Sequence, residues 1–353
     1  MSERKIITVF GATGTQGSSV LRSLAANKTT PFSLRAITRN PSSSASKSLV
    51  DSCPDIDIVK ADGWDKASLV SAFSGSWAVF VNTNSDDPSF EDGSGRIEVQ
   101  QGKLIVDAAV EAGVEVFVYS GAASASAITK GKLKIEAFDN KAAISEYARG
   151  KKEFKSTIIV VSGWYFETFY MSDVAVLYGG FPYHPSSDGA LVLKLPRWGG
   201  KDEKVPWISM TEDFGDIVHG ALLDPERWNG KLIQGVSDPR SSEEVTATFQ
   251  KVTRKKARYE HIERWQDFDV KNIRALETVK MNFALVQETG GLYYGEKTDT
   301  AIPAELKKKA AMASGKTGEE TVLYTLEKMF EKDFQDDEMK GQDNYVREGA
   351  ATV

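Results

Sequence analysis

The sequence predicts an α/β fold in which a doubly wound parallel sheet is covered by helices on both faces and is followed by a smaller α+β second lobe. Three observations indicate this fold. Short apolar runs alternate with helical stretches over residues 1–162, and the runs are apolar throughout, as expected of strands buried on both faces. A glycine-rich turn follows the first run. The residues after 162 have a looser pattern, which indicates a separate and less regular lobe.

The strands expected in the first part are residues 5–10, 33–38, 56–60, 77–81, 114–119 and 157–161. The helices expected between them are residues 18–27, 66–73, 97–112 and 135–149. The third of these helices is typical, because Ile97, Leu104 and Ile105 recur at helical spacing and Gly113 follows its end. Strands that alternate with helices along the chain favour parallel pairing with helical crossovers.

Beyond Ser162, glycine, proline and aromatic residues cluster in residues 178–200, where we expect loops and a short hairpin. The further elements expected are helices at residues 211–223, 241–252 and 317–330 and a strand at residues 231–235 that returns to the sheet. Apolar content falls from residue 331 onward, which predicts a mobile acidic tail. The expected domains are a nucleotide-binding domain at residues 1–162, a second lobe on the substrate or partner side at residues 163–330, and the tail at residues 331–353.

Composition excludes several classes of protein. The chain has 353 residues, of which 41% are hydrophobic and 27% charged, proportions that argue against wholesale disorder and against a membrane-embedded protein. Its net charge of −6 argues against direct binding to nucleic acid. The single cysteine excludes an intramolecular disulfide, and the three histidines lie far apart without ligands at metal-binding spacing, so no metal site is expected. We expect a cytoplasmic location, with the nucleus as a second one, and no membrane partner.

The strongest chemical signal is the sequence GATGTQG, which places Gly11, Gly14 and Gly17 between a predicted strand and a predicted helix. In a Rossmann site the first glycine permits a tight turn, the second lets the backbone approach a pyrophosphate, and the third allows close packing of helix on strand. The strand–turn–helix context supports a dinucleotide site over the alternative, a plain glycine-rich turn.

The end of the second predicted strand indicates which dinucleotide is bound. Thr38, Arg39 and Asn40 stand there without an acidic residue, and a guanidinium matches the 2′-phosphate of NADP(H), whereas NAD sites place a carboxylate on the ribose. The alternative is that Arg39 is only a solvated charge. By topology, Ala61 and Asp62 are expected near the adenine. The residues expected over the ribose and diphosphate are Asn82, Thr83 and Asn84.

With these residues the chain resembles the NmrA-like family, atypical short-chain dehydrogenases/reductases, and within it the NADPH-sensing branch. The resemblance covers about residues 5–235 and is carried by VFGATGTQG at residues 9–17, TRNP at 38–41, QGKL at 101–104, VYSG at 118–121, FDNK at 138–141, YFE at 165–167 and PW at 206–207. The contacts that it implies for NADP(H) are Gly11, Thr13, Gly14, Thr15, Gln16, Gly17, Arg39, Asn82, Thr83, Asn84, Lys141, Tyr165, Phe166, Glu167 and Thr168.

The resemblance leaves catalysis open. Active short-chain dehydrogenases use a serine with a Tyr-x-x-x-Lys pair, in which the tyrosine is the general acid and the lysine lowers its pKa. Here Lys141 occupies the lysine position and Ser120 can take the serine position, but Ala137 stands where the tyrosine belongs. Lys141 can still bind ribose or assist proton transfer. A plain surface charge is the alternative.

Two functions follow as hypotheses. The first is a cofactor or redox sensor that acts through a regulatory protein partner, with transcriptional regulation as the readout that the resemblance implies. The second is an NADPH-dependent reductase of a small quinone, imine or carbonyl compound that uses Lys141. A homodimer is an open possibility for the assembly. The aromatic residues expected either to line the substrate side of the site or to form the core of the second lobe are Trp164, Tyr165, Phe166, Phe169, Tyr170, Phe181 and Tyr183.

Overall fold

The computed structural model describes residues 4–29, 31–201, 204–271 and 274–335. Its main sheet has seven parallel strands in the order β10-β6-β5-β4-β1-β2-β3. Their bounds are β1 Ile6–Phe10, β2 Ser33–Thr38, β3 Ile56–Lys60, β4 Ser76–Val81, β5 Val116–Gly121, β6 Ser156–Ser162 and β10 Leu232–Gly235. The chain starts at the centre of the sheet, runs to one edge and then returns to build the other half. The predicted doubly wound fold is confirmed, as is the return of β10, which pairs in parallel with β6.

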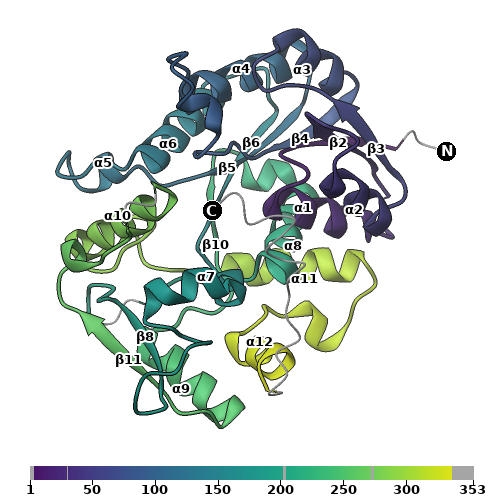
Figure 1. Ribbon diagram of the computed structural model, residues 1–353. Coiled ribbons are helices and arrows are strands. Elements are labelled where there is room, and N and C mark those ends of the chain that lie inside the picture. The colour runs from purple at the N-terminus through teal and green to yellow at the C-terminus, as the bar shows by residue number, and fades with distance from the viewer. Residues whose placement is uncertain (1–3, 30, 202–203, 272–273, 336–353) are drawn as a thin grey trace.

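Helices cover both faces of this sheet (Figure 1). One face carries α3 (Lys66–Phe73), α4 (Glu98–Glu111) and α6 (Glu136–Arg149), which pack side by side. The other face carries α1 (Thr15–Ala25), α2 (Ser44–Ser52), α8 (Gly215–Leu222) and α11 (Ala301–Ala313). The short helix α5 (Ala125–Ile128) follows β5.

Strand side chains alternate between these two helical layers. On β5, Phe117 and Tyr119 belong to the hydrophobic cluster on the α4 and α6 face, whereas Val116 and Val118 belong to the cluster on the α1 and α8 face. All four are 3% exposed or less. Because both faces are apolar, the strands appear in the sequence as continuous apolar runs.

The second lobe contains two small sheets and four further helices. Its strands are β7 (Trp164–Tyr165) paired with β9 (Trp207–Ile208), and β8 (Leu191–Pro196) paired with β11 (Ala257–Ile262), both in parallel. Its helices are α7 (Ser172–Ala175), α9 (Ser242–Thr253), α10 (Arg274–Thr289) and α12 (Leu326–Asp333). The hairpin expected in residues 178–200 is wrong, because the partner of β8 is β11, which comes much later in the chain.

The helix expected at residues 317–330 is also wrong over most of its length. Only α12 is α-helical there. Just before and at its start, backbone N–H groups donate to buried carboxylates: Tyr324 N to Asp213 Oδ2 at 2.9 Å and Leu326 N to Asp238 Oδ2 at 3.0 Å. These carboxylates, which lie far away in the sequence, accept the hydrogen bonds that backbone carbonyls would accept in a helix.

The prediction of a mobile tail from residue 331 is wrong for the first residues of that range. Residues 331–333 belong to α12, and Phe334 is 1% exposed because it packs on Phe249, Phe330 and Tyr170. Residues 336–353 lie outside the described residues. The first part of the expected tail is therefore part of the folded second lobe.

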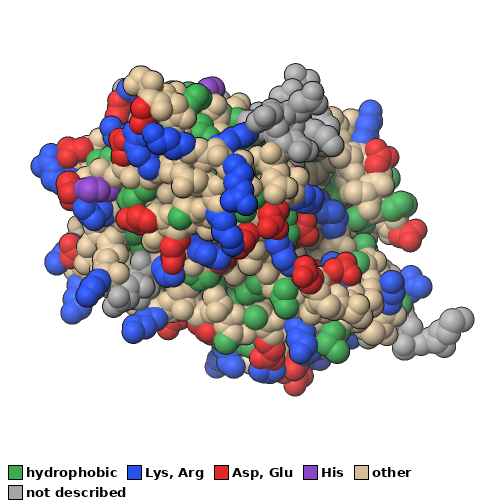
Figure 2. All heavy atoms as spheres, turned by 90° about the horizontal axis from the view of Figure 1, so that it is seen from below, with side chains coloured by type: hydrophobic (Ala, Val, Ile, Leu, Met, Phe, Trp, Pro, Cys, Tyr) green, Lys and Arg blue, Asp and Glu red, His purple; other side chains and the backbone are tan. Residues whose placement is uncertain are grey.

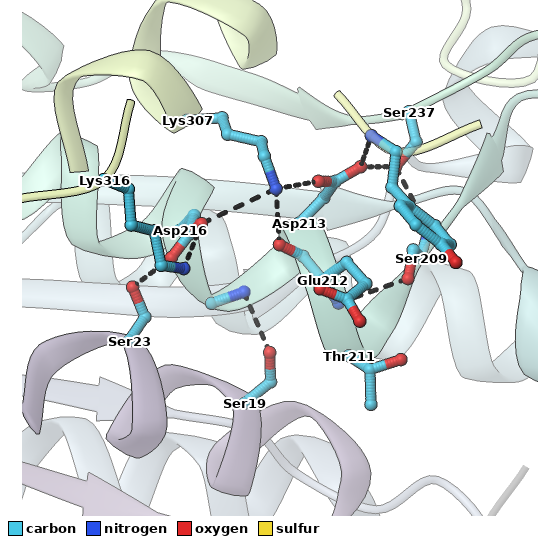
Figure 3. Close-up of polar contacts among 12 residues, drawn as sticks. Ser19, Ser23, Ser209, Thr211, Glu212, Asp213, Asp216, Ser237, Lys307 and Lys316 are labelled. Atoms are coloured by element: carbon cyan, nitrogen blue, oxygen red, sulfur yellow. Dashed lines mark hydrogen bonds and ion pairs between the residues drawn. The ribbon is translucent and has the colours of Figure 1, made fainter. Parts of the chain in front are cut away.

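A buried ionic cluster joins α8 to α11 and α1 (Figure 3). Lys307 Nζ lies 2.5 Å from Asp213 Oδ1 and 3.6 Å from Asp216 Oδ2, and it donates to the carbonyl of Glu212 at 2.7 Å. Ser23 on α1 donates to Asp216 Oδ1 at 2.5 Å. The cluster therefore connects residues 210–216 and the C-terminal helices to the first helix of the nucleotide-binding half.

Candidate active site

A cavity of about 380 Å³ lies at the carboxyl ends of β1, β4, β5 and β6, where ligands bind in open α/β sheets. The segments that line it come from both halves of the chain. From the first half these are Gly11, Thr13, Gly14, Thr15, Gln16, Arg39, Asn82, Thr83, Asn84, Ser85, Asp86, Ser120, Gly121, Ala122, Ala137, Phe138, Lys141, Val161 and Ser162. From the second half they are Gly163, Trp164, Tyr165, Thr168, Met171, Val174, Tyr178, Leu276, Thr278, Val279, Asn282 and Tyr293.

The glycine-rich turn has the geometry that a pyrophosphate requires. Gly11 has φ of +78°, and a Cβ there would lie 2.8 Å from Asn82 O. A Cβ on Gly17 would lie 2.2 Å from Gly11 O, so only glycine lets α1 pack this closely on the turn. Gly14 is the N-cap of α1 and offers no side-chain cap, and the first turn has no acidic residue. The N-terminal N–H groups of α1 thus suit an anion.

Gln16 links this turn to the second half of the chain. Its Nε2 donates to Tyr165 Oη at 2.8 Å, and its Oε1 is buried without a hydrogen-bond partner among the described residues. Burial also raises the pKa of Tyr165, so its phenol stays protonated at neutral pH. An unpartnered acceptor beside the turn is a further feature that fits a bound dinucleotide.

Arg39 lies at the rim of the cavity after β2. One of its guanidinium nitrogens, Nη1, lies 3.2 Å from Asp87 Oδ2, and its side chain is 68% exposed. Asp87 in turn accepts from Ser89 N at 2.9 Å, which fixes the carboxylate. Arg39 is therefore oriented by one partner while most of its guanidinium faces outward.

Several predicted cofactor residues lie outside the cavity lining: Gly17, Thr38, Asn40, Ala61, Asp62, Phe166 and Glu167. Glu167 accepts from Met210 N at 3.2 Å and Thr211 N at 3.0 Å, so its carboxylate holds the π-helical turn Met210–Phe214. Asp62 accepts from its neighbour Trp64 N at 2.8 Å and is exposed. Both carboxylates thus have backbone N–H partners within the protein that the sequence did not suggest.

Lys141 is held by a buried polar cluster at the end of β4. Its Nζ donates to Thr83 O at 2.5 Å, to Thr83 Oγ1 at 3.0 Å and to Glu98 Oε1 at 2.8 Å, so an ammonium would have its three N–H groups occupied. The Glu98 side chain is 1% exposed and the Lys141 side chain 16% exposed. Lys141 therefore forms an ion pair with Glu98 and reaches the cavity. The alternative that Lys141 is a plain surface charge is wrong.

The donor and the acceptor of each hydroxyl hydrogen bond in this cluster can be assigned. Thr83 Oγ1 donates to Glu98 Oε1 at 2.6 Å, so Tyr119 Oη, 2.7 Å from the same Oγ1, is the donor in that contact. Burial raises the pKa of Tyr119 well above its ordinary value, which keeps the phenol protonated. The hydrogen bonds thus run from Tyr119 through Thr83 to the carboxylate of Glu98, which also accepts from Lys141.

The cavity lining includes several aromatic residues. Of the aromatic residues after β6, Trp164 and Tyr165 line the cavity, together with Tyr178 and Tyr293. Phe166, Phe169, Tyr170, Phe181 and Tyr183 do not line it and pack in or against the second-lobe core. Both alternatives for the aromatic cluster are thus correct in part.

The sequence reasoning missed the contribution of α10. Leu276, Thr278, Val279 and Asn282 line the cavity from this helix, although no helix was predicted there. Apolar residues at helical spacing, Leu276, Val279, Phe283 and Val286, were the signal that could have identified it.

Among the described residues, no group of three or more histidine, cysteine, aspartate or glutamate side chains is arranged to hold a metal ion. No helix in the described part of the chain is both long and apolar enough to cross a membrane. The face of the molecule seen in Figure 2 carries interspersed acidic and basic side chains, and the second lobe has pairs such as Lys251–Glu327 and Arg258–Asp188.

The fold and the glycine-rich cavity place the chain among dinucleotide-binding α/β proteins of the doubly wound type. The model of the NmrA-like family matches residues 3–316, and the chain belongs to this family. It is 43% identical over 331 residues to the NmrA-like family domain-containing oxidoreductase hkm9 of Aspergillus hancockii, covering 94% of this chain and 97% of that relative. It is 45% identical over 338 residues to the corresponding oxidoreductase cpsB of Aspergillus campestris, covering 95% and 98%.

Solved structures share the fold at lower identity. NmrA, a negative transcriptional regulator, in complex with NADP superimposes with a TM-score of 0.71 at 20% identity, covering 98% of both chains. An NADPH-dependent quinone oxidoreductase from Escherichia coli, complexed with NADPH, has a TM-score of 0.58 at 20% identity and covers 92% of this chain and 99% of that one.

Proposed function

We propose that this protein is an NADP(H)-dependent oxidoreductase that reduces a small organic substrate. The observation that carries the proposal is a single cavity that joins a pyrophosphate-type glycine turn to Lys141 and then to an apolar compartment. The relatives named as oxidoreductases, at 43–45% identity over nearly the whole chain, support it. The structures of related fold that contain NADP or NADPH support the choice of cofactor.

The first half of the chain would bind the cofactor. The first turn of α1 and Gly14 hold the pyrophosphate, and Arg39 holds the 2′-phosphate through the nitrogens that Asp87 does not occupy. Asn82, Thr83 and Asn84 lie beside the ribose and diphosphate. Bound NADPH supplies the hydride for reduction of a C=O or C=N bond in the substrate.

Lys141 would provide the proton that balances this hydride. Reduction of a carbonyl places the hydride on carbon and a proton on oxygen, while NADPH is oxidised to NADP⁺. Lys141 Nζ can turn one N–H from Thr83 toward the substrate, because Glu98 keeps the ammonium paired, and the proton is then replaced from solvent.

The test is NADPH oxidation by the full chain with a panel of quinones, imines and ketones. We expect turnover above about 1 s⁻¹, within the ordinary range for enzymes. A Lys141→Ala variant that still binds NADPH should lose this turnover. NADPH that binds with no oxidation of any member of the panel would contradict the proposal.

The second candidate is a cofactor sensor that acts on a regulatory protein partner in the cytoplasm or nucleus, as a monomer or a homodimer. Ala137 favours it, because it lines the cavity where a catalytic tyrosine would stand, and the three hydrogen bonds that occupy Lys141 favour it too. In this case NADPH binding without turnover would be accompanied by capture of a partner that depends on the cofactor's redox state.

A further inference from the structure

We infer that the hydroxyl of Tyr293 donates a hydrogen bond to the carbonyl oxygen or imine nitrogen of the substrate and holds that atom beside Lys141. The inference rests on the proposed oxidoreductase function, since it assigns a residue to the substrate side of the same cavity. Tyr293 lies in the loop that follows α10 and lines the cavity. It belongs to none of the predicted cofactor motifs.

The ring of Tyr293 is held in place by other aromatic rings. It meets Phe138 edge to face at 5.7 Å and Tyr294 edge to face at 5.1 Å, and the ring of Trp198 lies 5.9 Å away. The indole N–H of Trp198 also donates to Gly291 O at 3.2 Å, which ties the same loop to the second lobe. A ring packed in this way cannot easily turn, so the direction of its hydroxyl is set before a ligand binds.

The hydroxyl of Tyr293 is accessible and makes no hydrogen bond to another described residue, whereas the hydroxyl of Tyr294 beside it donates to Gly235 O at 3.1 Å. Tyr293 Oη is not one of the side-chain polar atoms that are both fully buried and without a partner, so it keeps solvent-accessible surface. The residue is only 6% exposed and lines the cavity. A buried phenol normally has a hydrogen-bond partner, so this one is a group that a ligand can complete.

The hydroxyl of Tyr293 carries a proton and lies near the glycine turn. Burial raises the pKa of Tyr293, and the phenol of Tyr165 raises it further by charge repulsion, so the group stays protonated at neutral pH. Repulsion of this kind acts between groups that are close in space. Tyr165 Oη in turn lies 2.8 Å from Gln16 Nε2, at the start of α1. Tyr293 therefore offers a donor on the side of the cavity that would hold the cofactor.

Tyr293 also packs against the part of α6 that carries Lys141. Its ring partner Phe138 stands one residue after Ala137 and three residues before Lys141, and all three of these residues line the cavity. Residues three apart on a helix are neighbours on one face. The contact with Phe138 therefore places Tyr293 close to the ammonium and to the position at which Ala137 provides no hydroxyl.

A second donor is required because Lys141 is already engaged. Its three N–H groups are bonded to Thr83 and Glu98 before a ligand binds. As the carbon of a C=O or C=N bond accepts the hydride, negative charge develops on the oxygen or nitrogen, and a hydrogen bond from a fixed phenol stabilises that charge. The proton that completes the reduction still comes from Lys141, so the atoms and charges balance as in the proposed reaction. Tyr293 orients the acceptor atom and selects substrates that have one.

The test compares Tyr293→Phe with Tyr294→Phe in the full-length protein saturated with NADP⁺. Each change removes one hydroxyl, but only the hydroxyl of Tyr294 has an acceptor within the described part of the chain. The probes are acetophenone and 2-phenylpropene, which have nearly the same shape and differ in the carbonyl oxygen. NMR titration measures Kd for both. We expect Tyr293→Phe to weaken acetophenone binding roughly tenfold and to leave 2-phenylpropene unchanged, and Tyr294→Phe to bind both probes as the wild type does.

Thermal unfolding separates a ligand-binding hydroxyl from a structural one. Tyr293→Phe should unfold at the wild-type temperature, whereas Tyr294→Phe should unfold at a lower one because it loses an internal hydrogen bond. An unchanged Kd for acetophenone in Tyr293→Phe, or equal weakening of both probes, would overturn the inference. NADPH oxidation is measured separately. If no ketone or imine is reduced but Tyr293→Phe still weakens acetophenone selectively, the oxidoreductase function fails and the hydrogen bond from Tyr293 stands.

Discussion

Lys141 and Lys307 are both lysines with buried carboxylate partners, but they lie in different parts of the molecule and have different surroundings. The Lys307 side chain is 5% exposed and lies between α8 and α11, with carboxylates from Asp213 and Asp216 (Figure 3). The Lys141 side chain is 16% exposed, lines the cavity and has one carboxylate, that of Glu98. The same pair of chemical groups thus joins helices in one place and lies at the lining of the cavity in the other.

The other hydrogen-bond partners of the carboxylates beside Lys307 and beside Lys141 explain this difference. Asp213 also accepts from Ser237 Oγ and Tyr324 N, so its cluster ties several segments together. Burial lowers the pKa of Lys307, but the two aspartates outweigh it and raise the pKa overall, which keeps the ammonium charged. Around Glu98, the donors come only from Thr83 and Lys141 among the contacts described, and Oε2 has no partner in the described residues.

The largest expected effect is on stability at Lys307. Lys307→Met leaves Asp213 buried without a counter-charge and Asp216 with only Lys316, whose Nζ lies 3.8 Å from Asp216 Oδ2. It should lower the free energy of unfolding by about 3–5 kcal/mol. Urea unfolding measures the change. Lys309→Met is the matched control, because the Lys309–Asp224 pair on the same helix is partly exposed and should contribute less than about 1 kcal/mol. Equal losses for the two variants would remove the distinction between the clusters.

The next effect is on catalysis at Lys141. We expect the double variant Lys141→Met/Glu98→Gln to lower kcat about a hundredfold, or ~2.7 kcal/mol, because the proton donor is lost. Lys141→Met alone should also lose stability, since Glu98 is then buried without its partner, and the added Glu98→Gln change should restore much of it. A double variant that is stable and fully active would show that Lys141 serves only to neutralise Glu98.

His219 extends the Lys307 cluster and makes it sensitive to acid. Asn27 Nδ2 donates to His219 Nε2 at 3.0 Å, and His219 Nδ1 donates to Ser23 Oγ at 3.0 Å, which requires a neutral ring. Burial lowers the pKa of His219 from 6.5 to about 4. The unfolded chain therefore binds a proton that the folded chain excludes, and stability falls as pH drops below about 6.5.

We expect the free energy of unfolding to decrease by ~2 kcal/mol from this group between about pH 7.5 and pH 5, at about 1.36 kcal/mol per pH unit below its unfolded pKa. Urea titrations at the two pH values measure the change. His219→Gln should remove this part of the pH dependence. An unchanged slope in the variant would assign the acid sensitivity to other groups.

The smallest expected effect concerns the polar end of the cavity. Arg39→Ala should weaken NADPH binding by about 1.5 kcal/mol, roughly tenfold in Kd, through loss of a charge-assisted contact with the 2′-phosphate. NADH, which lacks that phosphate, is the internal control and should bind equally to both proteins. Equal losses for the two cofactors, measured by calorimetry, would remove Arg39 from the 2′-phosphate site.

Much of the nucleotide-binding half could be predicted because its signals are local. Strands β2 and β3 and helix α3 have the predicted bounds, and α3 begins where Asp65 accepts from Ala67 N and Ser68 N. The second lobe was harder to predict. The partner of β8 and the late start of the helix expected at residues 317–330 depend on segments that lie far away in the chain.

The sequence by itself determined the six strands of the first half and four of the helices between them, though not α2 or α5, together with the glycine turn and the position of Lys141 four residues after Ala137. Each depends on residues within a few positions of one another, where propensity, capping and sterics act directly. The tertiary structure alone decided that Tyr324 N donates to Asp213, 111 positions away, and that Asn282 lines the same cavity as the glycine turn. It also decided that Lys141 and not Lys307 lines the cavity. Burial and hydrogen-bond satisfaction are properties of the packed chain, so no local pattern encodes them.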